Sequence, residues 1–321
     1  MMNLLVATCY TPFREDRNAR IAHELNSELI RRGHRSDVIL LPWNHHTDLA
    51  SQSLALRLLD LTESAGNVVD RLITLGEPAI ALHHPFKISW SINNTRSHEN
   101  PFFGTARKSF YASLTDAKRF YSGKPLYPPL ANTAGLEPGP LGGFYLWVGT
   151  LAPSGRATHA LEAMRFVHPS VKLTLIINDL SITPDSSTAL EGLRQRAREW
   201  DLTDRVEFVL DSSRSTRREF IRNCQGLLAL HYDQPAPEDA LIEALYAHRP
   251  ILTFDDTGAP AGLIENGYNG VKHPPDPRML AWDMNRLATD HNLNQQFGKG
   301  AFATLAQHNI SWSKVAEQLL S

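Results

Sequence analysis

Short apolar runs alternate with stretches of helical periodicity along most of the 321-residue chain. Residues 4–7 and 38–41 are continuously apolar, as expected of strands buried on both faces of a sheet. Between them Ile21, Leu25 and Leu29 recur at helical spacing, and Gly33 follows at a position typical of a helix end. A strand, a helix and a strand in this order predict a parallel sheet with helices on both faces.

One proline- and glycine-rich stretch interrupts this alternation. Residues 128–143 contain four prolines and four glycines, a composition that suits neither a helix interior nor a central strand. The alternation then resumes, with strands predicted at residues 144–148, 171–177, 206–209, 227–230 and 251–254. We therefore predict two doubly wound α/β domains that face a cleft, with ligands bound beyond the carboxyl ends of the strands.

The same stretch sets the predicted domain boundaries. At roughly 150 residues per domain, a chain of this length accommodates two domains. The predicted parts are a contracted N-terminal domain at residues 1–133, a linker at 134–143, a second domain at 144–305, and a C-terminal helix at 306–321 that packs back on the first domain.

The composition argues against several classes of protein. A formal net charge of −2 leaves no basic excess for nucleic acid. Two cysteines, Cys9 and Cys224, are too few for a disulfide framework or a cysteine zinc site, and they suit a reducing cytoplasm. No segment reaches the roughly 18 apolar residues of a membrane helix, and residues 1–10 are interpreted as a strand, not as a signal peptide.

Several common functional motifs are absent from the sequence. There is no G-x-G-x-x-G turn after the first strand, no phosphate loop and no nucleophile elbow. Adjacent histidines at 45–46 and 83–84 have no carboxylate cluster beside them, so we expect no metal site. Four arginines lie around the first predicted helix: Arg17, Arg20, Arg31 and Arg32. We interpret them as a solvated face or, alternatively, as a contact with an acceptor or a membrane surface.

The second half resembles a glycosyltransferase of family 4 in a series of motifs that occur in the order of that family. They are YLWVGTLAPSGR at 145–156, ALEAM at 160–164, DRVEF at 204–208, EALYAHRPILT at 243–253, ENGYNG at 265–270 and ISW at 310–312. The first half matches less specifically, for example in HPFKISW at 84–90 and YPP at 127–129. The resemblance implies the GT-B fold, which consists of two Rossmann-like domains, and agrees with the two domains predicted from periodicity.

The family transfers a sugar from a nucleotide sugar with retention at the anomeric carbon, and it requires no metal. The resemblance therefore implies a nucleotide-sugar donor, a glycan or lipid-linked acceptor, no metal cofactor and a place in surface-polysaccharide assembly. It places Glu238 and Glu243 as candidate catalytic residues. The candidate donor-binding residues are Gly149, Thr150, Arg156, Gly258 and Ala259, and those on the acceptor side are Asn93, Asn94 and Arg96.

The sequence departs from the family pattern at the positions that bind the donor. Thr150 stands where the family has an arginine and Gly155 where it has a lysine, although Arg156 follows directly. Glu243 matches the second of two glutamates, while Pro235 stands in place of the first and Glu238 is a displaced substitute. Two charge-assisted hydrogen bonds to phosphate, at about 1.5–3 kcal/mol each, are therefore in question.

Two hypotheses of different classes follow. In the first, the chain is an active glycosyltransferase in which Arg156 binds the diphosphate, Glu243 the donor ribose or sugar, and residues 93–94 the acceptor. In the second, it is a catalytically inactive relative that acts as a partner or scaffold of an active glycosyltransferase, or as a nucleotide-sugar sensor. An unrelated α/β hydrolase or kinase is disfavoured by the missing nucleophile elbow and phosphate loop.

Overall fold

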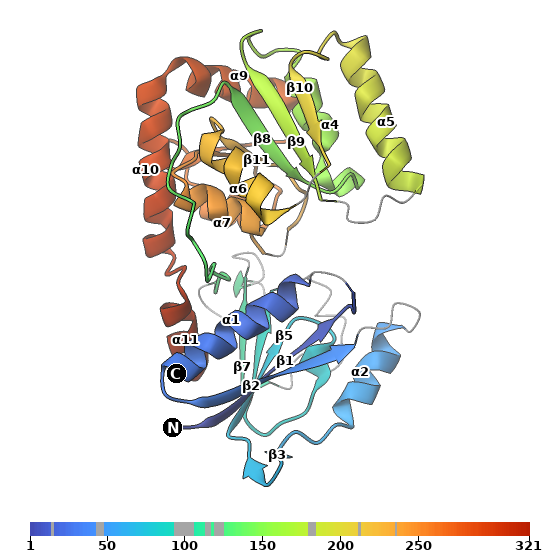
Figure 1. The fold of residues 1–321 in the computed structure, drawn as a ribbon, viewed down its shortest axis with the longest axis vertical. Coiled ribbons are helices and arrows are strands. Elements are labelled where there is room, and N and C mark those ends of the chain that lie inside the picture. The colour runs from blue at the N-terminus through green and yellow to red at the C-terminus, as the bar shows by residue number, and fades with distance from the viewer. Residues whose placement is uncertain are drawn as a thin grey trace. The chain divides into compact units, whose positions relative to one another are not determined.

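Two compact units make up the chain in the computed structural model, whose ribbon is drawn in Figure 1. Residues 1–131 and 309–321 form the first unit, and residues 132–308 form the second. The structure describes residues 1–13, 16–42, 48–92, 106–112, 117–118, 125–178, 184–210, 213–234 and 236–321.

A parallel five-stranded sheet in the order β2-β1-β5-β6-β7 is the centre of the first unit. Its strands are β1 (Asn3–Tyr10), β2 (Arg35–Pro42), β5 (Arg71–Leu75), β6 (Lys87–Ser91) and β7 (Lys108–Tyr111). The other elements are α1 (Arg17–Arg31), α2 (Leu49–Arg57), the two-residue strands β3 (Glu63–Ser64) and β4 (Asn67–Val68), the 3-10 helix η1 (Ala79–Ala81) and α11 (Trp312–Leu320).

The predicted stripe of α1 is its buried face. Ile21, Leu25 and Leu29 have almost no exposed surface, and Asp16 caps the helix by accepting hydrogen bonds from the next backbone amides. Gly33 has φ +84, a left-handed conformation that suits glycine at a helix end. Of the basic residues on this helix, Arg20 pairs with Glu24 and both Arg31 and Arg32 pair with Glu28, so these charges are partly neutralised.

The C-terminal helix α11 packs beside α1 in the first unit (Figure 1). The guanidinium of Arg32 donates to Ser313 Oγ at 2.9 Å, and Arg71 Nη1 donates to the carbonyl oxygen of Leu320 at 2.6 Å. The ring of Trp312 meets Trp90 edge to face, with centroids 6.3 Å apart. These contacts attach residues 309–321 to the sheet of the first unit.

The second unit has a parallel six-stranded sheet in the order β10-β9-β8-β11-β12-β13. Its strands are β8 (Phe144–Gly149), β9 (Lys172–Ile177), β10 (Val206–Val209), β11 (Leu227–Ala229), β12 (Ile251–Phe254) and β13 (Gly270–His273). Its helices are η4 (Pro153–Gly155), α4 (Ala157–Ala163), α5 (Pro184–Glu199), α6 (Arg214–Asn223), α7 (Asp239–Tyr246), α8 (Ala259–Leu263), α9 (Pro277–Thr289) and α10 (His291–Gln307).

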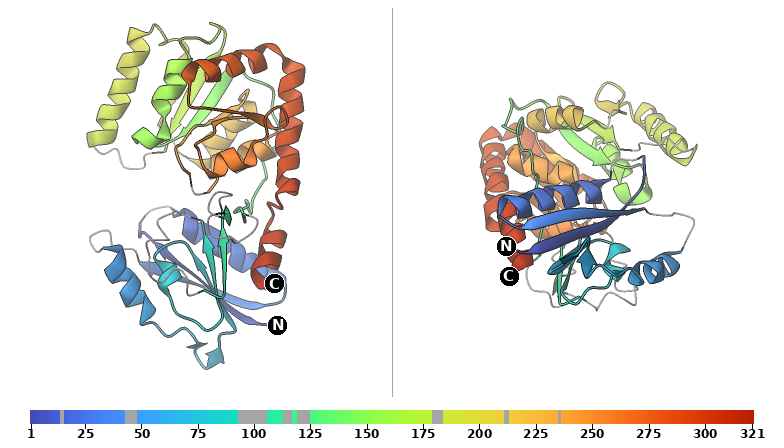
Figure 2. Two further views of the ribbon diagram at one scale, coloured as in Figure 1. Left: turned by 180° about the vertical axis from the view of Figure 1, so that it is seen from behind. Right: turned by 60° about the horizontal axis from the view of Figure 1, so that its bottom comes forward.

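Figure 2 shows the same strands and helices from two further directions. Two buried aromatic residues of β8, Tyr145 and Trp147, lie in the main core of the second unit, and Tyr145 Oη donates to the carbonyl oxygen of Met284 on α9 at 2.7 Å. The prediction of two doubly wound α/β halves with parallel sheets is confirmed.

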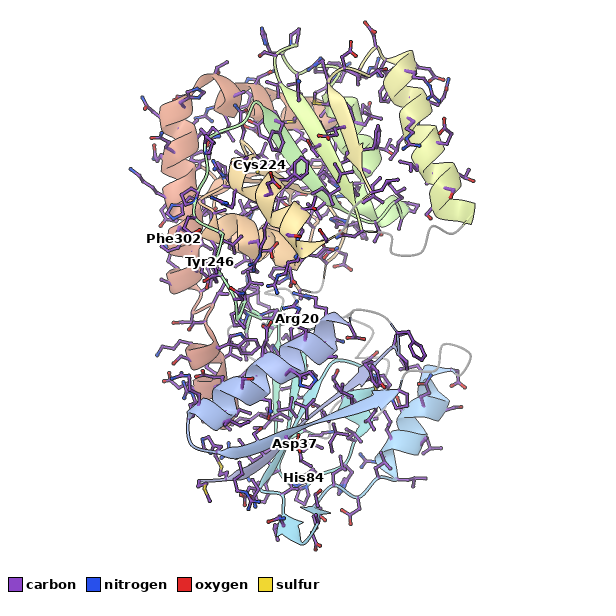
Figure 3. The ribbon with its side chains drawn as sticks, viewed as in Figure 1. Arg20, Asp37, His84, Cys224, Tyr246 and Phe302 are labelled. Carbon is purple, nitrogen blue, oxygen red and sulfur yellow. The ribbon has the colours of Figure 1, made fainter. Side chains whose placement is uncertain are left out.

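Helix α10 and strand β13 are additional to the elements predicted from periodicity. Two glycines weaken the helical signal of α10, but each marks a close approach of two backbones. A Cβ on Gly298 would lie 2.3 Å from the carbonyl oxygen of His248, and one on Gly300 would lie 2.2 Å from that of Tyr268. Farther along this helix, the ring of Phe302 lies 6.4 Å from that of Tyr246 on α7 (Figure 3).

None of the helices in the described part of the chain combines the length and the apolar composition that a membrane span requires.

Candidate functional site

The carboxyl ends of three neighbouring strands in the second unit, β8, β11 and β12, bring polar residues together. In a parallel sheet of this kind, ligands bind beyond these ends. Gly149 ends β8, His231 follows β11, and Asp256 follows β12. The candidate site is built from these three loops and from the helices that they enter.

An ion pair joins the loops after β8 and β12. Arg156 donates from Nη1 and Nη2 to the two carboxylate oxygens of Asp256, and both distances are 2.6 Å. The hydrogen bonds from Arg156 hold the pKa of Asp256 below its usual range, and the same bonds raise the pKa of Arg156. A two-pronged pair of this geometry is the strongest form of charge-assisted hydrogen bond.

The backbone and two aromatic rings hold Arg156 in place. The residue has φ 56 and ψ 30, a left-handed conformation that is uncommon outside glycine, at the start of α4. Its guanidinium carbon lies 5.2 Å from the ring centroid of Tyr232 and 5.4 Å from that of Phe254. Because the side chain is only 12% exposed, it is a largely desolvated cation.

A cavity of about 410 Å³ borders Arg156. The loop after β8, the first turn of α4 and one side of α5 line it, and its charged or titratable lining residues are Arg156, His159 and Arg196. No carboxylate belongs to the lining among the described residues. Burial, followed by the charge of Arg156, lowers the pKa of His159. The two arginines therefore make the cavity suited to an anionic group, and the imidazole of His159 adds little positive charge near neutral pH.

A histidine fixes the loop between Gly149 and Gly155. The imidazole of His231 stacks on the indole of Trp147 with centroids 5.5 Å apart and an interplanar angle of 14°. A Cβ on Gly149 would lie 2.1 Å from His231 Nε2, and one on Gly155 would lie 3.5 Å from it. His231 is buried, and its Nε2 has no hydrogen-bond partner within the described residues. Gly149 thus makes room for the imidazole, whereas at Gly155 a Cβ would lie 2.3 Å from the carbonyl oxygen of Thr150.

Glu238 lies at the start of α7 but does not cap it through its side chain. It instead accepts a hydrogen bond from Gln234 Nε2 at 3.2 Å, and both side chains line a small cavity of about 20 Å³ that His231 also borders. That volume holds about one water molecule. Glu238 is partly exposed at this edge of the sheet.

Glu243 is engaged by three arginines of α6. It has no exposed surface, and it accepts hydrogen bonds from Arg217, Arg218 and Arg214 at 2.8, 3.0 and 3.4 Å. Arg218 also donates to the carbonyl oxygen of Ala134 at 3.0 Å, so the cluster ties α7, α6 and the entry segment of the unit together. The carboxylate therefore supplies one negative charge to three arginines, with both oxygens occupied.

The loop after β12 turns back over the loop after β11. Gly258 has φ +73, and a Cβ there would lie 2.5 Å from the carbonyl oxygen of Gln234. Ala259 is buried, and its backbone amide donates to the same oxygen at 2.8 Å. Only glycine fits this approach, which fixes the segment that carries Asp256 against the segment that carries Glu238.

The structure therefore brings six predicted residues to this edge of the second sheet: Gly149, Thr150, Arg156, Glu238, Gly258 and Ala259. Thr150 is exposed. Glu243 lies farther along α7, with its carboxylate on the α6 arginines. The predicted acceptor-side residues Asn93, Asn94 and Arg96 lie outside the described residues.

Sequence reasoning missed the residues that contact the predicted ones. They are Asp256, His231, Tyr232 and the α6 arginines. The sequence holds a signal for the arginines, because an acidic residue within the apolar run ALIEALY requires a buried counter-charge. Within the described part of the chain, no three His, Cys, Asp or Glu side chains are grouped so as to hold a metal ion.

Three solved structures share this architecture over nearly their whole lengths. HepE of Anabaena, in complex with UDP and glucose, has a TM-score of 0.73 at 14% identity, covering 100% of this chain and 98% of HepE. Sucrose-phosphate synthase of Thermosynechococcus elongatus has a TM-score of 0.72 at 14% identity, covering 98% and 97%. A glycosyltransferase of Rickettsia africae has a TM-score of 0.75 at 11% identity, covering 99% and 97%. The fold is the GT-B fold of glycosyltransferases.

A family model for glycosyl transferases group 1 matches residues 142–304, just over half of the chain. The chain belongs to this family. The match covers the second sheet and the helices around it, including the loops that carry Arg156, Glu238 and Asp256. No curated protein sequence matches the chain significantly.

Proposed function

We propose that the protein is a retaining glycosyltransferase of family 4 that transfers a sugar from a nucleotide-sugar donor to a glycan or lipid-linked acceptor. The observation that carries the proposal is the placement of Arg156, a largely buried guanidinium beside a cation-lined cavity at the ligand-binding edge of the second sheet. The similar solved structures support the choice of donor, because those of HepE are complexes with UDP, with UDP and glucose, and with UDP-glucose.

In this proposal the chain's own side chains stabilise the leaving group. The bond between the anomeric carbon and the diphosphate oxygen breaks, a bond from that carbon to an acceptor hydroxyl oxygen forms, and the hydroxyl proton passes to the departing diphosphate oxygen. The departing nucleoside diphosphate takes the electron pair, and Arg156, aided by Arg196, stabilises its added negative charge. Glu238 accepts a hydrogen bond from a donor hydroxyl. We expect no metal requirement.

The acceptor and the location are further parts of the proposal. We place the acceptor on the first unit, where Asn93, Asn94 and Arg96 belong to the sequence motif that follows β6. Both cysteines are buried free thiols, as expected of a protein that works in the reducing cytoplasm.

A second candidate function is a catalytically inactive relative that senses nucleotide sugar or supports an active partner enzyme. The engagement of Glu243 by three arginines favours it, because a carboxylate with both oxygens occupied is not free to accept hydrogen bonds from a donor.

Calorimetric titration with UDP, GDP and their sugar conjugates tests the proposal. We expect one of these ligands to bind the wild type, and Arg156→Gln to weaken that binding about tenfold or more, because one charge-assisted hydrogen bond is lost. Arg194→Gln is the matched control, since this arginine lies exposed on α5 and only approaches Glu191. Failure of every nucleotide to bind the folded protein would contradict the proposal. Binding without release of UDP from its sugar would favour the second candidate.

A further inference from the structure

We propose that Asp256 is an internal anion that occupies the guanidinium of Arg156, and that a diphosphate ligand binds by displacing it. The inference rests on the proposed function in one respect, the choice of Arg156 as the diphosphate-binding residue. It adds that the affinity of this site is limited by Asp256, a residue that no sequence motif singled out.

Arg156 and Asp256 form a bidentate pair. Both terminal nitrogens of Arg156 meet both oxygens of Asp256 at 2.6 Å. This parallel arrangement is the one in which arginine also binds phosphate. A carboxylate and a phosphate therefore compete for the same face of the guanidinium.

The cavity beside Arg156 has a positively charged lining. Arg156 also borders the cavity of about 410 Å³, whose described lining has Arg196 and His159 but no carboxylate. Asp256 is not among the lining residues and approaches Arg156 from the loop after β12. The cavity thus gives an anion access to the guanidinium of Arg156, with the positive charge of Arg196 in the same lining.

Two further acidic residues near the Arg156–Asp256 pair oppose the binding of a diphosphate. Asp255 precedes Asp256 on the same loop and is exposed, and Asp233 lies on the loop after β11, where its backbone amide donates to the carbonyl oxygen of Asp256 at 3.0 Å. These acidic side chains repel a diphosphate, and while Arg156 is paired with Asp256 its charge offsets this repulsion less. The Asp256 side chain is 31% exposed, so its carboxylate has access to solvent when it is displaced.

Contacts that do not involve the Asp256 carboxylate also hold this loop. The backbone carbonyl of Asp256 makes the contact to Asp233, and the next residue, Thr257, is anchored by its own hydroxyl to the carbonyl oxygen of Phe254 at 2.9 Å. Asp256→Asn keeps the shape of the side chain and removes its charge. We therefore expect this variant to fold, and Asp256→Ser provides a second variant.

The test is a calorimetric titration of the full chain with two probes, inorganic pyrophosphate and UDP. The proteins are the wild type, Asp256→Asn, Asp256→Ser, the double variant Asp256→Asn/Arg156→Gln and the control Asp255→Asn. We expect both Asp256 variants to bind pyrophosphate about tenfold more tightly than the wild type, and the double variant to lose the gain. Asp255→Asn removes an equal charge without releasing Arg156 and should change affinity by less than about threefold.

Each outcome decides the inference. Weaker or unchanged pyrophosphate binding in both Asp256 variants would overturn it, and so would the absence of pyrophosphate binding in every protein. A gain that persists without Arg156 would also overturn it. If pyrophosphate binding tightens as expected while UDP binds none of the proteins, the displacement stands and the proposed function fails. If UDP binds the wild type but not more tightly in the Asp256 variants, the proposed function stands and the displacement fails.

Discussion

Arg217 makes two hydrogen bonds to Glu243, from Nε to Oε2 at 2.8 Å and from Nη2 to Oε1 at 3.1 Å. The carboxylate has no exposed surface, and two further arginines of α6 share it. Removal of the one carboxylate would leave largely desolvated guanidinium groups without their counter-charge. The cluster is therefore expected to be structural, whatever else Glu243 does.

Glu243→Gln should lower the free energy of unfolding by about 3–5 kcal/mol, the range for breaking a buried ion pair on one side. Urea unfolding followed by circular dichroism measures it. Glu219→Gln is the control, because Glu219 is exposed on α6, the helix of the three arginines, and its effect should stay within about 0.5 kcal/mol. A loss below about 1 kcal/mol in Glu243→Gln, together with lost donor binding, would instead assign this residue to the donor.

Gly149→Ala should destabilise the second unit by about 1–3 kcal/mol, because the new Cβ would lie 2.1 Å from His231 Nε2. The same change in a His231→Ala background should cost clearly less, since the obstructing ring is absent. Gly192→Ala is the matched control: nothing lies within 4 Å of its Cβ position in α5, so alanine should stabilise by about 0.4–1 kcal/mol. Equal losses for Gly149→Ala in both backgrounds would show that the imidazole is not the cause.

The pH dependence of stability should reveal Lys87, which is buried in β6. Its Nζ donates to the carbonyl oxygens of Ile80 and Leu82, and burial, followed by the charge of Arg57, lowers its pKa to about 8. The unfolded chain, with the ordinary lysine pKa of about 10.4, then binds more protons than the folded chain between these values. The free energy of unfolding should therefore rise as the pH increases from about 8 to 10.

Urea unfolding of the wild type and Lys87→Met across this pH range isolates the effect, because other lysines and tyrosines titrate equally in both proteins. The difference in stability should grow in favour of the wild type as the pH rises. A constant difference would mean that Lys87 keeps an ordinary pKa when it is folded.

Sugar transfer should depend on Arg156. If the protein is active, Arg156→Gln should lower kcat/KM about 10- to 100-fold, the equivalent of one charge-assisted hydrogen bond of about 1.5–3 kcal/mol to the leaving diphosphate. Release of UDP from a UDP-sugar is the assay, with Arg194→Gln as the control. An unchanged kcat/KM would remove Arg156 from the reaction.

Local periodicity was sufficient to predict most strands and helices, because burial on one or both faces leaves a pattern within a few neighbouring residues. It missed α10, where Gly298 and Gly300 serve contacts with the distant residues His248 and Tyr268. Local periodicity could not predict the residues that contact the site residues either, because these contacts also join distant parts of the sequence. Arg156 and Asp256 are 100 positions apart, and only the parallel order of β8, β11 and β12 brings their loops together.

The most direct test of the account observes Arg156 itself while a nucleotide binds. In a protein labelled with ¹⁵N-arginine, the side-chain Nε resonance of Arg156 is assigned with Arg156→Gln and followed during a UDP titration. We expect this resonance to shift and to saturate with the dissociation constant found by calorimetry, while that of Arg194 stays in place. Saturable UDP binding that leaves the Arg156 resonance unmoved would show that Arg156 does not contact the nucleotide.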